Sequence, residues 1–176
     1  MESTQRLLGV VLAGGQSRRF GSDKALAVHD GKALLTHAFD ALSGWCELVV
    51  ISGRAEGPAP CLPDWPRPGM GPLAGLTAAL RLAVDEDFDA VLSCGVDSPG
   101  LPQNLPELLG PGPAIIAEQP VIGLWPARAA AVVAEAILGG DARHSMYALA
   151  EALGARRVAL PSPPANVNFP GDLTAL

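Results

Sequence analysis

Short apolar runs alternate with longer stretches of helical spacing along most of the chain. Apolar runs of strand length predict strands at residues 7–12, 48–51, 90–94, 114–117, 121–125 and 157–160. Apolar positions three and four residues apart predict helices at 32–42, 72–84, 126–138 and 145–153. Almost continuously apolar strands that alternate with helices are typical of a mostly parallel sheet covered on both faces. The pattern therefore predicts a Rossmann-like α/β fold with three layers, α/β/α.

Length and composition fit a single domain over residues 1–176. The 49% of hydrophobic residues provide for a buried core, and this composition excludes a disordered chain. No uncharged apolar stretch reaches the roughly 18 residues of a membrane span. The apolar run at 7–12 is too short for the core of a signal peptide and lacks a basic leader. We therefore expect a cytoplasmic protein that does not contact membranes.

The net charge of −6 argues against a nucleic-acid-binding surface. Against this acidic background, Arg18, Arg19 and Lys24 form a small basic cluster that contains only one acid, Asp23. Such a cluster suits a compact anionic ligand, for example a nucleoside triphosphate.

The three cysteines, at positions 46, 61 and 94, are widely spaced, so they indicate neither a zinc site nor a disulfide framework. We expect them to be reduced and mostly buried.

Three segments with candidate chemistry follow predicted strands: the loop after Leu12, the loop after Ile51, and Asp97 after the strand at 90–94. Ligands of open parallel sheets bind beyond the carboxyl ends of the strands. The three segments would meet at that edge of the sheet. We therefore place the candidate site there.

The first segment begins with Gly14 and Gly15 directly after a strand. Paired glycines let the backbone approach a phosphate, and turn conformations direct successive N–H groups at one anion. Arg19 and Lys24 could add positive charge for the oxygens of a triphosphate. The spacing fits neither the dinucleotide fingerprint nor the P-loop. An ordinary strand-to-helix turn is the alternative interpretation.

Asp97 follows a buried strand, where a carboxylate can bind a hard cation whose shell is completed by substrate phosphates. An aspartate that caps a turn before Ser98 is the alternative.

Near the C-terminus, Asn166 and Asn168 alternate on an extended segment, so their carboxamides could project together into a cleft. Asparagine is also common in turns, so a turn without a binding role stays open for this pair.

Four motifs in order resemble those of the MobA-like nucleotidyltransferase family, and together they span nearly the whole chain. Residues 12–24 resemble its L-A-G-G-x-x-x-R-M-G-x-x-K signature, with Phe20 in place of methionine. Residues 71–75 resemble its G-P-L-A-G turn, and 97–102 its C-D-x-P-x-x-P element, with Val96 in place of cysteine. Residues 166–173 resemble its N-x-N-T-P-E-[DE]-L segment, with Phe169 and Gly171 as departures.

The resemblance is strongest to the molybdenum cofactor guanylyltransferase branch. It implies a nucleotidyltransferase fold and transfer of GMP from GTP to the phosphate of a molybdopterin-type cofactor, with release of pyrophosphate. It implies Mg²⁺ bound by Asp97, and transient contacts with proteins that deliver or accept the cofactor are compatible with it. The implied catalytic residues are Arg19, Lys24 and Asp97; the implied nucleotide-binding residues are Leu12, Ala13, Gly14, Gly15, Lys24, Ser52, Asp64 and Asp97. The implied acceptor-binding residues are Arg143, Asn166 and Asn168.

Two other functions stay open at this point. One is a related transferase that uses CTP or another phosphorylated acceptor; the other is a protein that binds a nucleotide without catalysis. Gly14, where cytidylyl relatives tend to have alanine, favours the larger guanine base. The presence of Arg19, Lys24 and Asp97 together favours catalysis over binding alone. Ser52 falls where relatives often have asparagine, which leaves the details of base recognition open.

Overall fold

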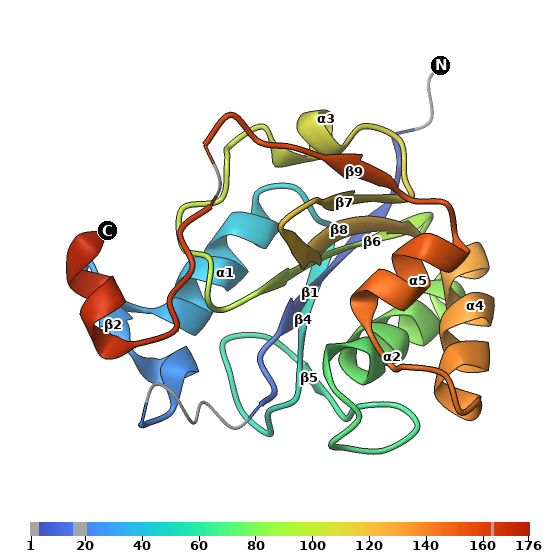
Figure 1. Ribbon diagram of the computed structural model, residues 1–176, viewed down its shortest axis with the longest axis horizontal. Helices are drawn as coiled ribbons and strands as arrows, with labels where there is room; N and C mark the ends of the chain where they lie inside the picture. The colour runs from blue at the N-terminus through green and yellow to red at the C-terminus, as the bar shows by residue number, and fades with distance from the viewer. Residues whose placement is uncertain (1–3, 16–20, 163) are drawn as a thin grey trace.

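The computed structural model describes residues 4–15, 21–162 and 164–176. One seven-stranded sheet runs through the molecule in the order β5-β4-β1-β6-β8-β7-β9 (Figure 1). β8 runs antiparallel to both of its neighbours, and all other neighbouring strands are parallel. The strands are β1 (Leu7–Leu12), β4 (Leu48–Ser52), β5 (Cys61–Leu62), β6 (Ala90–Gly95), β7 (Ala114–Ile116), β8 (Gln119–Pro126) and β9 (Arg156–Val158). A separate two-stranded hairpin is formed by β2 (Val28–His29) and β3 (Lys32–Ala33).

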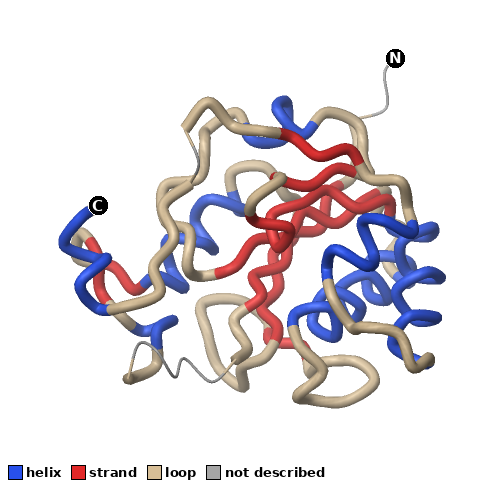
Figure 2. Tube along the Cα trace, in the orientation of Figure 1, coloured by secondary structure: helices blue, strands red, loops and turns tan. Residues whose placement is uncertain are grey.

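Helices cover both faces of this sheet, as the three-layer prediction required (Figure 2). α1 (Leu34–Ser43) and the short α3 (Leu105–Leu109) pack on one face. α2 (Pro72–Asp85), α4 (Ala127–Gly139) and α5 (Met146–Ala152) pack on the other. Two 3₁₀ helices, η1 (Lys24–Leu26) and η2 (Pro170–Ala175), complete the described elements. None of the described helices combines the length and apolar character that crossing a membrane requires.

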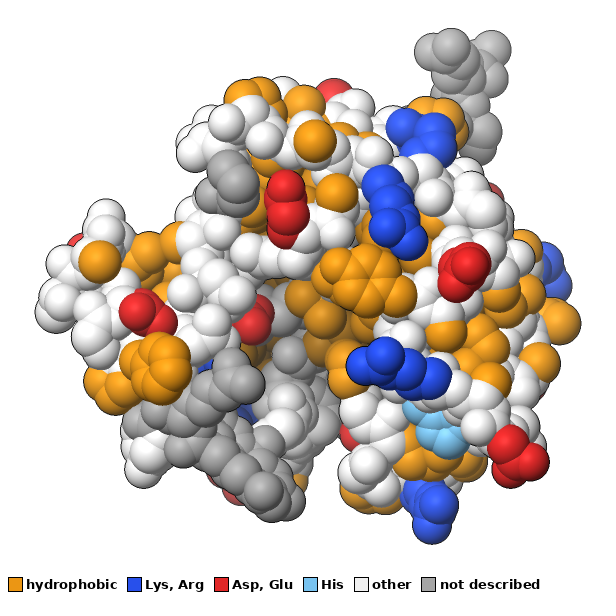
Figure 3. Space-filling model, in the orientation of Figure 1, with side chains coloured by type: hydrophobic (Ala, Val, Ile, Leu, Met, Phe, Trp, Pro, Cys, Tyr) orange, Lys and Arg blue, Asp and Glu red, His pale blue; other side chains and the backbone are white. Residues whose placement is uncertain are grey.

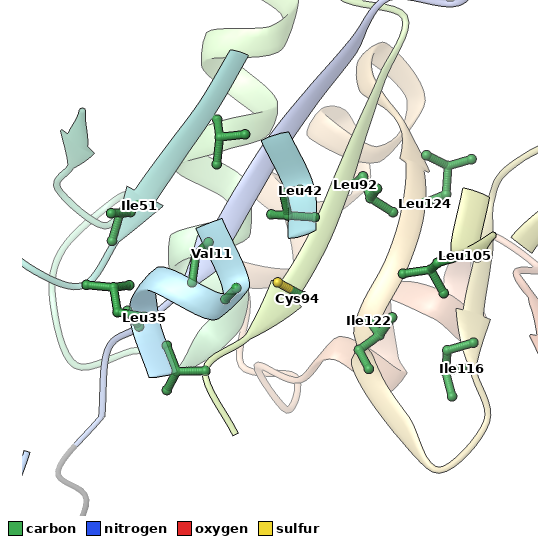
Figure 4. Packing of buried hydrophobic residues seen from close by; sticks show 14 of the residues in the cluster. Val11, Leu35, Leu42, Ile51, Leu92, Cys94, Leu105, Ile116, Ile122 and Leu124 are labelled. Atoms are coloured by element: carbon green, nitrogen blue, oxygen red, sulfur yellow. The ribbon is translucent and has the colours of Figure 1, made fainter. Parts of the chain in front are cut away.

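The alternation of side chains along β1 creates two separate cores, one on each side of the sheet. Leu8 and Val10 point toward α2, whereas Val11 points toward α1. Figure 4 shows the core on the α1 side, where Leu35 and Leu42 of the helix pack over Val11 and Cys94. Because β1 is buried on both faces, its sequence is continuously apolar and not alternating.

The predicted strands and helices are present, with shifts of one or two residues at most ends. The predicted helix at 32–42 is corrected at its start, because Lys32 pairs with His29 in the β2–β3 hairpin. Pro126, predicted to begin a helix, ends β8 and pairs with Ala90. The segment after Ile51, for which we predicted a loop, contains the short strand β5, which pairs with Ile51 and Ser52.

The cysteines are free, as predicted, but less buried than expected. Cys94 is fully buried on β6, whereas Cys46 and Cys61 are only partly buried. Burial raises the pKa of Cys46 to about 12. That thiol is therefore protonated at neutral pH and is a poor nucleophile.

A buried polar contact joins β6 to the antiparallel strand β8. Ser93 and Trp125 are both fully buried, and the Trp125 indole N–H donates to Ser93 Oγ at 2.9 Å. Ser93 Oγ in turn donates to the Val121 carbonyl oxygen at 2.7 Å. Buried polar groups need such partners, because an unpaired donor in a core is destabilising.

Replacing Ser93 by alanine should lower the free energy of unfolding by about 1–3 kcal/mol, because the buried Trp125 N–H would lose its acceptor. Urea unfolding measures the change. Ser43→Ala is the matched control, since Ser43 is exposed at the end of α1, and it should change stability by less than about 0.5 kcal/mol. Equal stability of the two variants would contradict the structural role of this contact.

Candidate active site

A cavity of about 590 Å³ opens beyond the carboxyl ends of β1, β4 and β6. Parallel pairing sets Leu12 beside Ser52 on one side and beside Gly95 on the other, so the loops that follow all start at one level. A hollow is visible in the middle of the face in Figure 3. The lining residues are Leu12, Gly14, Gly15, Lys24, Ser52, Asp64, Gly69, Gly71, Pro72, Gly75, Gly95, Val96, Asp97 and Val121.

Most of the nucleotide-binding residues implied by the sequence lie together in this cavity: Leu12, Gly14, Gly15, Lys24, Ser52, Asp64 and Asp97. Ala13 is an exception, because it packs into the core on the α1 side. Its N–H donates to the Ser52 carbonyl oxygen at 3.0 Å, which joins the ends of β1 and β4. Arg19 lies outside the described residues.

Closely packed glycines form one wall of the cavity. Gly53 has a φ of +80°, which favours glycine, and a Cβ on this residue would overlap the backbone of Gly14. A methyl group on Gly14 would lie 3.2 Å from Gly53 Cα, so alanine there would first press on the neighbouring loop. On α2, a Cβ at Gly75 would overlap Ser52 Oγ. These contacts bring the two loops and the start of α2 close together around the cavity.

Asp97 lies just past β6 and its carboxylate folds back over the strand end. A Cβ at Gly95 would lie 2.8 Å from Asp97 Oδ1, so glycine at 95 leaves room for the carboxylate. The described residues contain no group of three or more side chains able to bind a metal ion. A single carboxylate facing a cavity fits a hard divalent cation that takes its other ligands from substrate phosphates and water.

Asp64 lies on the loop before α2 and lines the same cavity. Its Oδ1 is buried and accepts no hydrogen bond from any described residue. Burial also raises the pKa of this carboxyl above its usual value. An unpaired acceptor at the wall of a cavity is suited to a ligand that carries N–H or O–H donors. The adjacent Trp65 does not line the cavity; its ring packs against α2, with the Arg81 guanidinium 4.8 Å from the ring centroid.

The C-terminal segment is joined to residues of the site by the backbone of Val167, a residue that is fully buried. The Val167 N–H donates to the Asp97 carbonyl oxygen at 2.7 Å. The Lys24 ammonium donates to the Val167 carbonyl oxygen at 3.0 Å. One residue thus connects the N-terminal loop to the aspartate after β6.

The asparagine pair flanks Val167, and neither residue is among those that line the described cavity, so the projection of both carboxamides into a cleft stays a prediction. Asn166 is exposed and Asn168 is half-buried. The N–H groups of Asn168 and Phe169 donate to Asp172 Oδ2 at 2.8 and 2.9 Å, and these bonds lower the pKa of Asp172. The segment is therefore held by its backbone, as in a capped turn.

Arg143 is exposed and is not part of the cavity wall. It precedes Ser145, the residue whose hydroxyl caps α5 by accepting from the Ala148 N–H at 3.1 Å. The carbonyl oxygen of the next residue, His144, lies 3.9 Å from the position of a Cβ on Gly71. Since Gly71 lines the cavity, the backbone next to Arg143 runs along its rim.

Some cavity residues carried no recognisable signal in the sequence. Val121 lines the cavity from β8, a strand that no motif connects to the site. Gly69 and Gly95 are isolated glycines outside the segments to which we assigned chemistry. Their position follows from the sheet order and the path of the loops, which spacing in the sequence does not reveal.

Comparison with known proteins gives a consistent result. Residues 9–159 match the family described as the MobA-like NTP transferase domain. A molybdenum cofactor guanylyltransferase of Acidiphilium cryptum (strain JF-5) is 36% identical, and the match covers 98% of this chain and 95% of that protein. The match covers nearly the whole length of both proteins, so the similarity is not confined to the glycine loop.

Solved structures share the fold at lower identity. Molybdopterin-guanine dinucleotide biosynthesis protein A from Archaeoglobus fulgidus superposes with a TM-score of 0.71 at 23% identity, covering 96% of this chain and 95% of that one. A 2-C-methyl-D-erythritol 4-phosphate cytidylyltransferase from Thermus thermophilus gives a TM-score of 0.63 at 16% identity, covering 94% and 95%. At these identities the likeness shows a common architecture and does not separate one nucleotide from another.

Replacing Asp64 by asparagine should raise the free energy of unfolding at pH 7 by at most about 1 kcal/mol, because it removes a charge whose buried Oδ1 has no partner among the described residues while solvent screens the rest of the carboxylate. The pKa of Asp64 is raised by folding, so its ionisation destabilises the protein as the pH rises through that pKa. The gain from asparagine should therefore shrink at a pH below the usual pKa of aspartate. Chemical unfolding at two pH values tests this, with the exposed Asp141→Asn as control. A gain that is independent of pH would contradict the role of ionisation.

Proposed function

Because this chain belongs to the family of MobA-like NTP transferase domains, we propose that it transfers the GMP part of GTP to the phosphate of a molybdopterin-type cofactor. The chain is a nucleotidyltransferase, with residues 1–176 acting as one domain. The single observation that supports the proposal best is the cavity in which Lys24, Asp64 and Asp97 come together. The guanylyltransferase relative, similar over nearly the whole chain, supports the choice of GMP.

The nucleotide lies along the cavity with its phosphates at the glycine loop. The backbone at Gly14 and Gly15 lines the cavity and can approach an anion closely, while the Lys24 ammonium adds positive charge. At the other end, Asp64 accepts hydrogen bonds from donors of the guanosine. The N1 and N2 groups of guanine match the unpaired acceptor at Asp64, whereas the Watson–Crick face of cytosine carries only its amino donor. Ser52 contributes at the same wall.

Members of this family generally use a divalent metal ion, and here we propose Mg²⁺. Asp97 would hold the ion through its carboxylate. When bound, Mg²⁺ neutralises negative charge on the phosphates. Asp97 itself is kept in place by the bond between its carbonyl oxygen and the Val167 N–H.

The reaction joins two anions, so charge repulsion is the main barrier that the protein must lower. An oxygen of the acceptor phosphate forms a bond to the α-phosphorus of GTP while the bond from that phosphorus to the bridging oxygen breaks. Pyrophosphate leaves with the electron pair. Lys24 and the Gly14–Gly15 backbone stabilise the charge on the leaving group. We assign the same role to Arg19, because the resemblance to the family motif implies it. The protein orients both reactants, and no covalent enzyme intermediate is needed.

The acceptor approaches from the side of the C-terminal segment. Asn166 and Asn168 flank Val167 there, and Arg143 lies near the rim of the cavity by Gly71. Carboxamides that donate and accept suit a pterin, and an arginine suits its phosphate. The open rim leaves space for contact with proteins that deliver or receive the cofactor.

Asp97→Asn should reduce pyrophosphate release from GTP and acceptor by at least about 10²-fold, because a neutral amide binds a hard cation more weakly than a carboxylate does. Lys24→Ala should slow transfer by roughly 10²–10³-fold through loss of one positioned charge. A coupled pyrophosphate assay measures both, and Asp141→Asn should retain normal activity. Near-normal turnover of Asp97→Asn would refute the metal assignment.

GTP should be preferred over CTP by at least about 10²-fold in kcat/KM, a difference of about 3 kcal/mol. Asp64→Asn should erode this preference, because an amide oxygen is a weaker acceptor for the N–H groups of guanine than a carboxylate. Competition at equal nucleotide concentrations measures the ratio. A clear preference for CTP would refute the guanylyl assignment and leave the nucleotidyltransferase class intact.

A further inference from the structure

Arg54 and Asp23 form an ion pair next to the cavity, between the loops that follow β4 and β1. Arg54 Nη1 lies 2.9 Å from one Asp23 carboxylate oxygen and 2.8 Å from the other. The Arg54 side chain is only 20% exposed, and its Nε is buried without a hydrogen-bond partner among the described residues. A guanidinium withdrawn from water to this degree needs a charged partner, and Asp23 provides it.

Asp23 also controls the local structure around Lys24. Its Oδ1 accepts a hydrogen bond from the Ala25 N–H at 3.2 Å, which caps η1, and Lys24 is the first residue of that helix. The Asp23 carbonyl oxygen accepts from the Leu26 N–H at 3.1 Å. Asp23 therefore fixes the short turn that begins at Lys24.

The negative charge of Asp23 is unfavourable for phosphate binding unless a cation neutralises it. Asp23 is the residue before Lys24, and its carboxylate repels the phosphates that the lysine is proposed to bind. The Arg54 guanidinium compensates that charge. Arg54 is not among the described residues that line the cavity, and its ion-pair partner is Asp23, so we assign its effect to Asp23 and not to direct contact with the nucleotide.

We propose that Arg54 is a positioning residue which, through the Asp23 carboxylate, holds Lys24 in the orientation and electrostatic environment that a triphosphate requires. This inference rests on the proposed function, since it assumes that Lys24 binds the phosphates of GTP. It adds a residue of the loop after β4 to the phosphate side of the site. The loop's first residue, Gly53, is packed against Gly14, so both loops are held together at two adjacent points.

The first test asks whether Arg54 works through Lys24. Arg54→Ala should weaken GTP binding about tenfold in otherwise unchanged protein. In a Lys24→Ala background the same substitution should weaken it less than about twofold, because the group that it positions is gone. Isothermal titration with GTP and Mg²⁺ measures all four proteins. Equal losses in both backgrounds would overturn the proposal, because they would indicate an independent or merely structural role.

The second test asks whether Arg54 works through Asp23. Asp23→Ala should also weaken GTP binding, but the Arg54→Ala/Asp23→Ala double variant should bind no more weakly than Arg54→Ala alone, since the uncompensated carboxylate has been removed. Losses that multiply would indicate direct contact of Arg54 with the nucleotide and overturn the proposal. Arg54→Lys should recover part of the affinity, because it keeps the positive charge but not the planar guanidinium.

Arg128→Ala is the matched control, because Arg128 forms an exposed ion pair with Asp87 near the opposite end of β6 and should leave GTP binding unchanged. Failure of the unaltered protein to bind GTP would refute the proposed function. If that protein binds GTP and Lys24→Ala weakens the binding, an unchanged affinity in Arg54→Ala would refute this inference alone.

Discussion

The parallel pairing of β1 with β4 on one side and β6 on the other positions the whole candidate site. It sets Leu12 in register with both Ser52 and Gly95, so the glycine loop, the Gly53–Arg54 loop and Asp97 begin at the same edge. A slip of one residue would turn the side chains of β1 to the opposite faces and displace both cores. The packing of Leu8, Val10 and Val11 therefore also fixes the location of the polar residues beyond the strand ends.

Secondary contacts then bring the remaining segments to this edge. The start of α2 approaches Ser52 because residue 75 is glycine, and the C-terminal segment is joined to Asp97 and Lys24 through Val167. Each contact links parts of the chain that are distant in sequence. The result is a cavity lined by the glycine loop, Lys24 and the carboxylates of Asp64 and Asp97.

The sequence predicted the strands and helices well because long, continuously apolar runs and helical spacing are local signals. It also predicted that Lys24, Ser52, Asp64 and Asp97 belong together, since motif order and strand ends are visible in the chain. It did not predict the hairpin β2–β3, α3 or β5, because two-residue strands and short helices carry little periodicity. The Arg54–Asp23 pair was also invisible, since an ion pair across 31 positions depends on how two loops pack.

The bond between Val167 and the two polar residues has a consequence for synthesis of the protein on the ribosome. β1, β4 and β6 can pair as soon as residue 95 has emerged, but Lys24 and Asp97 are joined through a residue 70 positions after Asp97. The sheet can thus form while the site lacks one of its ties. A nascent chain would acquire the shape of the nucleotide cavity before it acquires the completed arrangement of Lys24 and Asp97, which delays assembly of the site until the C-terminal segment has left the exit tunnel.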